Sequence, residues 1–211
     1  IHTDPERLLR ETGVKAEWMP YAADPLVWQP RPEIEPIHDI AFIGHQGRYP
    51  ARAEWIEGML EAFPKFKIQG GVFFEECSAM MHTAKVVLNH CEADSINMRV
   101  IEVLMNGQCL LTPHTSDLDA LGLEDAEHLL TYTSLQEAIS KCKFALNNPE
   151  VRKKLGEAGR LWALNGHTYM HRAYTLLGLP VPNLSVMDAL LKKEPAWLPD
   201  KLPYSLPIKE S

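Results

Sequence analysis

The sequence predicts an α/β protein built on a parallel sheet with helices on both faces. Short apolar runs alternate with helical patterns along residues 39–132, at the spacing of β-α-β units. These runs are short and bounded by turn-forming residues, as buried strands of a parallel sheet are. Consecutive parallel strands need a crossover connection, so the intervening helices cover the sheet. In such sheets ligands bind beyond the carboxyl ends of the strands, where the strand order reverses.

Residues 1–36 are expected to be a junction that precedes the sheet. Asp4-Pro5 and the helical pattern that ends at Gly13 predict a short helix, and residues 14–19 are a candidate strand. Prolines are dense in residues 20–36, and at that density they can neither continue a helix nor occupy a central strand. We therefore expect residues 20–36 to be an extended linker and the folded domain to span residues 37–178.

Strands are predicted at residues 39–44, 65–70, 84–89, 109–112 and 127–132. Helices are predicted at residues 51–63, 74–82 and 96–106, and from residue 135 to about residue 177 with interruptions at Asn148-Pro149 and Gly166. Prolines recur after Gly178, so residues 179–211 are expected to form an extended proline-rich tail with a helical turn near residues 188–193.

The composition excludes some classes of protein. The chain has 211 residues and a net charge of -7, which argues against a general nucleic-acid binder because such proteins need a basic face. No apolar run approaches the ~20 residues of a membrane span. The four cysteines form no metal-binding motif, and a reduced, cytoplasmic setting is expected. Because the chain begins at Ile1 rather than Met, we expect a removed upstream segment.

The strongest candidate for a binding site lies in residues 94–112. Asp94 and Glu102 are separated by seven residues, and Glu102 lies off the apolar stripe of the predicted helix. A helix start suits a phosphate, and a carboxylate two turns further could accept hydrogen bonds from a ribose diol. In the structural alternative, Asp94 or Ser95 caps the helix and Glu102 forms a weak surface pair with Arg99. Spacing alone favours this alternative.

A second candidate is the loop after the first predicted strand. Gly44 would let the backbone approach a phosphate closely, and Arg48 or Arg52 could clamp it. The dinucleotide fingerprint Gly-x-Gly-x-x-Gly is absent, and taken alone this loop is better explained as a solvated turn. Lys85 lies just inside a predicted strand, where it either extends from the strand end or reaches a ligand anion.

His167 and His171 have a spacing that would suit metal ligation, but no third ligand motif accompanies them. A helix start capped by His167 or Thr168, with aromatic packing from Tyr169, is the favoured interpretation. No metal site is predicted.

Several blocks of residues together match a known family. The blocks are Asp39-Ile-Ala-Phe-Ile-Gly44, Lys85-Val-Val-Leu-Asn89, Ile96-Asn-Met-Arg-Val-Ile-Glu102-Val-Leu, Gly107 with Leu110-Leu-Thr112, Tyr132, and His167-Thr-Tyr-x-His-Arg172. In order and spacing over roughly residues 14–177, the chain resembles the C-terminal, donor-binding half of two-domain (GT-B) glycosyltransferases. The resemblance is to the bacterial branch of spore maturation protein CgeB-like sequences.

The resemblance implies a Rossmann-like domain that binds a nucleotide diphosphate sugar, with a UDP-sugar as the first choice. In that superfamily two acids spaced by seven residues bind the donor, the first at the sugar hydroxyls and the second at the ribose. Here Glu102 would take the ribose, and Asp94, one methylene shorter than the family's Glu, the sugar. Arg52, or its neighbour Arg48, would meet the diphosphate. The remaining expected donor-binding residues are Gly44, Lys85, Asn97, Met98 and Arg99.

The resemblance also implies that no metal or other cofactor is needed, because cationic side chains and helix dipoles neutralise the leaving diphosphate. The acceptor, which could be a glycan, a protein or a lipid, would bind an N-terminal domain that is missing here. Residues 14–30 would form the junction to that domain, and the tail would cross back onto it. This chain alone is expected to be inactive.

Two other functions stay open at this point. A nucleotide-sugar epimerase would share the sheet and the nucleotide site, but it would release a changed sugar nucleotide without an acceptor. A non-catalytic interaction module with a decayed pocket would explain the Asp at position 94.

Overall fold

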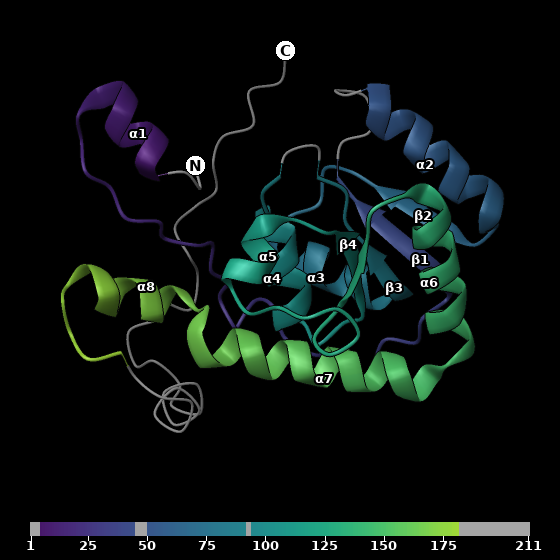
Figure 1. Cartoon of the computed structure of the whole chain (residues 1–211). Helices are drawn as coiled ribbons and strands as arrows, with labels where there is room; N and C mark the ends of the chain where they lie inside the picture. The colour runs from purple at the N-terminus through teal and green to yellow at the C-terminus, as the bar shows by residue number, and fades with distance from the viewer. Residues whose placement is uncertain (1–4, 45–49, 92–93, 182–211) are drawn as a thin grey trace, which may run out of the picture.

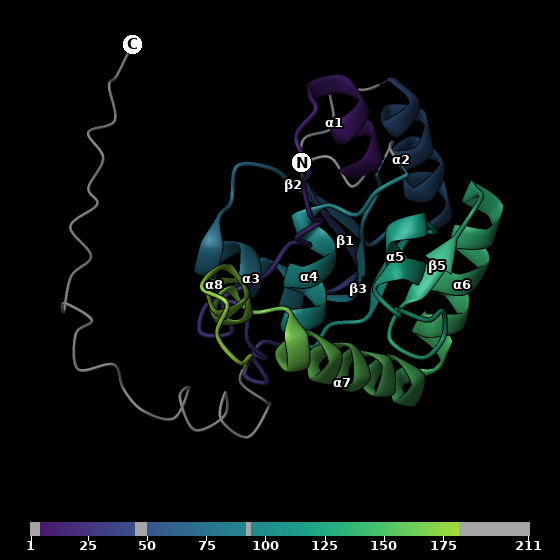
Figure 2. The same ribbon diagram turned by 60° about the vertical axis from the view of Figure 1, so that its left-hand side comes forward.

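The computed structural model describes residues 5–44, 50–91 and 94–181. Within these residues, five strands form one parallel sheet in the order β2-β1-β3-β4-β5 (Figure 1, with β5 labelled in Figure 2). The strands are β1 His38–Ile43, β2 Phe66–Gln69, β3 Ala84–Leu88, β4 Leu110–Pro113 and β5 Leu130–Tyr132. The helices are α1 Pro5–Thr12, α2 Pro50–Ala62, α3 Phe74–His82, α4 Met98–Met105, α5 Ser116–Ala120, α6 Leu135–Asn147, α7 Pro149–Gly166 and α8 Tyr169–Leu176.

The predicted Rossmann-like parallel sheet is confirmed. Every pairing in the sheet is parallel, and β1 lies between β2 and β3. The chain passes from β1 to β2 on one side and then crosses to β3 on the other, so the strand order reverses between β1 and β3. Ile40 is paired with Val86 across this boundary. The carboxyl ends of these two strands therefore flank the crevice where α/β sheets bind ligands.

Alternate residues of the central strands face two separate hydrophobic cores. Ala41 and Val87 pack in one core with residues of α3 and α4, while Ile40 and Val86 pack in the other with residues of α2 and α6. Figures 1 and 2 show these two pairs of helices on opposite sides of the sheet. The near-continuous apolar runs of the sequence arise because both faces of these strands are covered.

Three local details differ from the expectations. Residues 14–19 form no strand, and within the described residues they pair with no strand of the sheet. The short helix α5 was not predicted. The strand β5 begins at Leu130, later than the predicted residue 127, because a turn precedes it. In that turn Ala126 has a φ of 61°, and Asp125 Oδ1 accepts a hydrogen bond of 2.7 Å from the Thr131 amide.

Residues 20–36 lack helices and extended ladders, as predicted, but they are not a free linker. Ala23 and Trp28 are buried in the core with α3 and α4. The Ala23 amide donates to the His167 carbonyl at 3.0 Å. The guanidinium of Arg172 donates to the carbonyls of Pro20 at 2.7 Å and Tyr21 at 2.8 Å. The packed unit therefore begins before residue 37.

The end of α4 touches α7 through glycine. A Cβ built at Gly156 in α7 would lie 2.1 Å from the carbonyl oxygen of Gly107, which follows α4. Gly107 has a φ of +71°, a conformation that favours glycine. One turn further along α7, a Cβ at Gly159 would lie 2.6 Å from a methyl of Leu104. This backbone contact fixes the position of α4 against α7.

The start of α8 is capped by Thr168, which was one of the two expected capping residues, His167 and Thr168. Its hydroxyl accepts from the amide of His171, and the His171 ring accepts from the Thr168 amide. Aromatic packing comes from His167 stacked on Trp162 at 3.9 Å, whereas Tyr169 is half exposed, contrary to the expectation. In the described part of the chain, no cluster of His, Cys, Asp and Glu could hold a metal ion.

No helix in the described ranges is both long enough and apolar enough for a membrane span. The helical turn expected near residues 188–193 lies outside the described residues.

Candidate functional site

A hollow of about 410 Å³ opens at the carboxyl ends of β1 and β3, where the strand order reverses. Its floor is the end of β1 and the first residues after β3, and α2 and α4 supply its walls. The lining residues are Tyr21, Phe42, Ile43, Gly44, Arg52, Asn89, His90, Asn97, Met98, Arg99 and Glu102. The site expected from sheet topology is therefore present as a real hollow in the surface.

The structure brings six of the nine expected donor-site residues together. The six that line the hollow are Gly44, Arg52, Asn97, Met98, Arg99 and Glu102. Asp94 and Lys85 are not among its lining residues, and Arg48 lies outside the described residues.

Glu102 is the buried acid of the hollow. Its side chain is only 10% exposed, and its Oε2 accepts a hydrogen bond of 2.7 Å from Arg99 Nη1. Burial raises the pKa of Glu102 above its ordinary value, and the nearby Arg99 partly offsets this. The i, i+3 pair expected from the sequence is formed, but it is buried rather than on the surface. Both groups are therefore fixed and partly desolvated at the edge of the hollow.

Asp94 does not cap α4, contrary to one expectation. That helix begins at Met98, after the N-cap residue Asn97, whose side chain makes no capping hydrogen bond. The carboxylate of Asp94 instead accepts hydrogen bonds from Ser116, at 2.8 Å from the amide and 2.9 Å from the hydroxyl. These bonds lower the pKa of Asp94. Asp94 is exposed, so it stays ionised while it holds the start of α5.

A polar network built on Asn89 connects the strands to the start of α4. Its Nδ2 donates to the hydroxyl of Thr112 at 3.0 Å and to Cys91 Sγ at 3.1 Å, and its Oδ1 accepts from Asn97 Nδ2 at 3.1 Å. The Oδ1 atom of Asn97 is buried and has no partner among the described residues. A buried acceptor without a partner is costly, so a donor from a ligand would suit this position.

An aromatic group borders the hollow beside Arg52. The His90 and Tyr132 rings both stack on Trp55 of α2, at 4.8 Å and 4.9 Å between centroids. The Tyr132 hydroxyl donates to the carbonyl of Asn89 at 2.9 Å and lies 3.0 Å from His90 Nδ1. Burial, with a smaller contribution from Arg52, lowers the pKa of His90. The histidine is therefore neutral near pH 7.

Lys85 lies near the amino end of β3, at the opposite end of the sheet from Gly44 and Asn89. Its Nζ pairs with Asp39 Oδ1 at 2.8 Å. Of the two alternatives left open, this placement matches a lysine that extends from a strand end. The parallel sheet separates Lys85 from the other expected donor-site residues.

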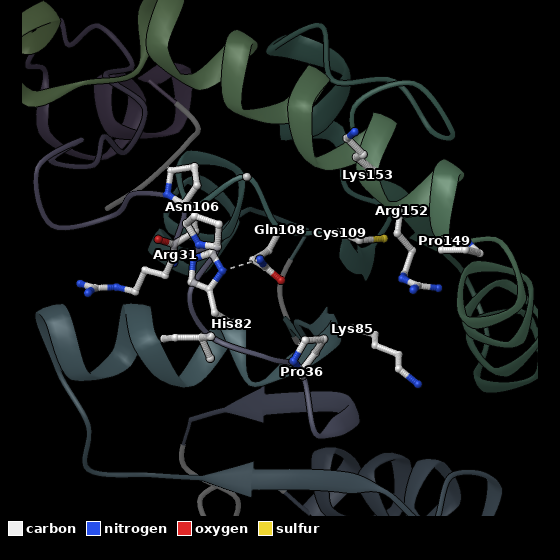
Figure 3. Close-up of a pocket in the computed structure, with 15 residues that line it drawn as sticks. Arg31, Pro36, His82, Lys85, Asn106, Gln108, Cys109, Pro149, Arg152 and Lys153 are labelled. Atoms are coloured by element: carbon white, nitrogen blue, oxygen red, sulfur yellow. Dashed lines mark hydrogen bonds between the residues drawn. The ribbon is translucent and has the colours of Figure 1, made fainter.

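A second hollow of about 320 Å³ lies around Lys85 (Figure 3). Four cationic residues line it, Arg31, Lys85, Arg152 and Lys153. Figure 3 shows that the charged ends of Arg31 and Lys153 point in directions different from those of Lys85 and Arg152. Lys85 is paired with Asp39, and Arg152 donates to two carbonyls at the end of α6. These cations do not converge on one anion position.

Several lining residues of the main hollow were not predicted. Asn89 and His90 follow β3 directly, so the rule that singled out Gly44 after β1 could also have indicated them. Phe42 contributes from within β1. Tyr21 comes from the proline-rich segment, and no sequence pattern indicates that this segment folds back onto the site.

The fold resembles glycosyltransferases of known structure. Sucrose-phosphate synthase from Thermosynechococcus elongatus is 14% identical with a TM-score of 0.58, over 82% of this chain and 56% of that one. The C-terminal domain of the group 1 glycosyl transferase LpcC from Francisella tularensis is 13% identical with a TM-score of 0.52, over 66% of this chain and 95% of that domain. The pneumococcal O-GlcNAc transferase GtfA, solved in complex with UDP and GlcNAc, is 10% identical with a TM-score of 0.59, over 90% of this chain and 43% of that one.

The chain thus spans about half the length of the two larger enzymes and matches nearly all of the LpcC domain. At identities this low, the structural likeness shows the fold alone, which is that of a Rossmann-like domain of GT-B glycosyltransferases. No curated protein matches the chain significantly. A model of the glycosyl transferase-like family matches residues 29–178, which cover most of the chain and include the whole sheet and the hollow. The chain therefore belongs to the glycosyl transferase-like family.

Proposed function

We propose that this chain is the donor-binding part of a glycosyltransferase that moves a sugar from a nucleotide diphosphate sugar to an acceptor. The observation that carries the proposal is the hollow at the strand reversal, with Arg52 at one wall and the buried Glu102 at another. The likeness to LpcC, an isolated C-terminal domain, and to GtfA, which was solved with UDP, supports it.

Each lining element has a part in this proposal. Gly44 leaves room for the diphosphate above the end of β1, and Arg52 neutralises its charge. The start of α4 adds the partial positive charge of a helix N-terminus. Glu102, held by Arg99, accepts hydrogen bonds from the ribose hydroxyls. A carboxylate in a fixed geometry discriminates well between a diol and an analogue that lacks it.

Asp94 is the weaker match, because both of its oxygens already accept hydrogen bonds from Ser116. A contact with the sugar hydroxyls would use the second lone pair of each Asp94 carboxylate oxygen. Lys85 has no part in donor binding in this proposal. The proposal also includes membership of the CgeB-like branch and a bacterial, cytoplasmic setting. In it, the acceptor binds a further N-terminal domain. We expect no turnover by these 211 residues alone.

The proposal can be tested by calorimetric titration of the chain with UDP, GDP, ADP, CDP and dTDP. We expect one of them to bind at a single site. Replacing Glu102 by alanine should weaken that binding by about 10- to 100-fold, the cost of hydrogen bonds to a charged acceptor. Glu150→Ala, on the first turn of α7 and outside the hollow, is the matched control and should bind like the wild type.

A ligand analogue separates the ribose contact from a general loss of structure. The 2′,3′-dideoxy form of the same nucleotide should bind the wild type about as weakly as the normal nucleotide binds Glu102→Ala. It should bind the two proteins equally well. If the dideoxy nucleotide binds the wild type more tightly than it binds Glu102→Ala, Glu102 contacts another part of the ligand. If none of the five nucleotides binds, donor binding by this chain is refuted.

A further inference from the structure

The hydrogen bonds around His90 define where its proton lies. A tyrosine hydroxyl has one proton, and Tyr132 gives it to the carbonyl of Asn89 at 2.9 Å. The pKa of Tyr132 is raised by burial, so the hydroxyl keeps that proton at neutral pH. The hydrogen in the 3.0 Å contact between Tyr132 and His90 Nδ1 must then come from the histidine. The network therefore assigns the proton of neutral His90 to Nδ1.

This assignment leaves Nε2 of His90 as an acceptor. Among the described residues no group hydrogen-bonds to Nε2, although the ring lines the hollow. The stack on Trp55 and the bond to Tyr132 hold the ring in one orientation. An unprotonated nitrogen repels a phosphate oxygen, because both carry lone pairs. In its neutral form, His90 is thus poorly suited to the ligand that the hollow is proposed to bind.

Burial is the main reason why His90 is neutral without a ligand, and the charges around the ring contribute to this. Arg52 from α2 opposes a second positive charge, and Trp55 from the same helix has no charge. Tyr132 from β5 is neutral, and burial raises the pKa of the Cys91 thiol, so Cys91 is neutral as well. The negative charge of Glu102 is matched by Arg99. No carboxylate is paired with His90 in the described part of the chain.

We infer that His90 takes up a proton from solvent when a diphosphate enters the hollow, and that its Nε2–H then donates to a phosphate oxygen. This rests on the proposed donor site. The diphosphate brings negative charge beside Arg52, which favours the imidazolium and so opposes the effects of burial and of Arg52 on the ring. The proton balance is complete, because one proton leaves the solvent and imidazole becomes imidazolium. The imidazolium of His90 then adds a positive charge beside the diphosphate, which is the leaving group of the transfer.

The expected consequence is tighter binding at lower pH. A group whose pKa is low in the free protein and higher in the complex binds a proton together with the ligand. Between those two pKa values, the dissociation constant should rise by up to about tenfold for each unit of pH. Above the pKa of the complex, the affinity should become independent of pH.

The test is titration with UDP-glucose, or with the glucose derivative of whichever nucleoside diphosphate binds best. A diphosphate diester does not titrate near neutral pH, so any proton uptake comes from the protein. Calorimetry between pH 6.0 and 8.0, in two buffers with different ionisation enthalpies, gives the number of protons taken up. We expect a substantial fraction of one proton for the wild type, and less as the pH rises.

Two substitutions distinguish the roles of the two ring nitrogens. His90→Asn keeps an amide donor near the Nδ1 position, and His90→Gln keeps a neutral donor near the Nε2 position. Both should bind without proton uptake and with flat pH profiles, and His90→Gln should retain more of the affinity. His114→Gln is the control, because His114 is exposed and pairs with Asp119 outside the hollow. It should leave the proton uptake unchanged.

The outcomes separate this inference from the proposed function. Binding by the wild type with no proton uptake would overturn the role of His90 and leave the donor site intact. Uptake that persists in both His90 variants would assign the proton to another group, which also overturns it. If no nucleotide sugar and no nucleoside diphosphate binds, the proposed function itself fails.

Discussion

Replacing Gly156 by alanine is expected to lower the free energy of unfolding by about 3 kcal/mol, although alanine favours helices by about 1 kcal/mol over glycine. The added Cβ would lie 2.1 Å from the carbonyl oxygen of Gly107. Only a shift of the backbone can relieve this clash, because the added Cβ and the Gly107 carbonyl oxygen both belong to rigid parts of the chain. Since Gly107 has a φ of +71°, its peptide cannot easily rotate away without losing its turn. The helix α7 would have to move off α4.

Urea denaturation followed by circular dichroism measures this effect. Gly166→Ala is the matched control in the same helix, because nothing lies within 4 Å of its added Cβ. That control should change stability little. If Gly156→Ala has the same midpoint as the wild type, the close contact between α4 and α7 is not present in solution.

Replacing Arg99 by methionine is expected to destabilise the protein by about 2–3 kcal/mol at pH 7.5, because it leaves Glu102 buried without its cation. With side chains 19% and 10% exposed, the Arg99–Glu102 pair is too buried for water to replace the lost partner fully. The double variant with Glu102→Gln should recover much of the loss, since an amide needs no counter-charge. Equal stabilities for the single and double variants would mean that the pair is not coupled.

The pH dependence of the Arg99→Met variant gives a second check. In the wild type, burial already raises the pKa of Glu102 while Arg99 holds it down. Without Arg99, the pKa of Glu102 rises further, and its carboxyl is protonated at a higher pH. The stability of the variant relative to the wild type should therefore recover as the pH falls from 8 to 5, in urea titrations at each pH. A constant difference across this range would contradict the explanation.

The sheet could be predicted because its signal is local. The two strands that flank the site, β1 and β3, are apolar on both faces and are followed by a glycine and an asparagine, respectively. The helix α4 could be predicted because its apolar residues form a stripe along one helix face, which is also a local signal. Strand order was not predicted, but the position of the site followed from the general rule for parallel sheets.

The missing parts depend on contacts between distant segments. Nothing in the local sequence shows that Tyr21 and Trp28 fold onto α3, α4 and α8, since the prolines around them indicate only an extended backbone. Lys85 matched a family block by position, but the strand direction places it at the other end of the sheet. The acid at position 94 was expected to cap one helix and holds the start of another. His90 was missed because its setting depends on Trp55 and Tyr132, from two other elements.

The polar network on Asn89 gives the protein a natural chemical reporter. Cys77, Cys109 and Cys142 are buried, whereas Cys91 is only partly buried and accepts a hydrogen bond from Asn89 at the border of the hollow. We expect a small thiol reagent to modify Cys91 first in the folded protein, slowly because burial raises the pKa of its thiol, and all four thiols only after unfolding. Because Asn89 lines the hollow and bonds to Cys91, we expect the rate of that first modification to fall when a ligand fills the hollow. Ligands could thus be screened on the unaltered sequence, with no label introduced.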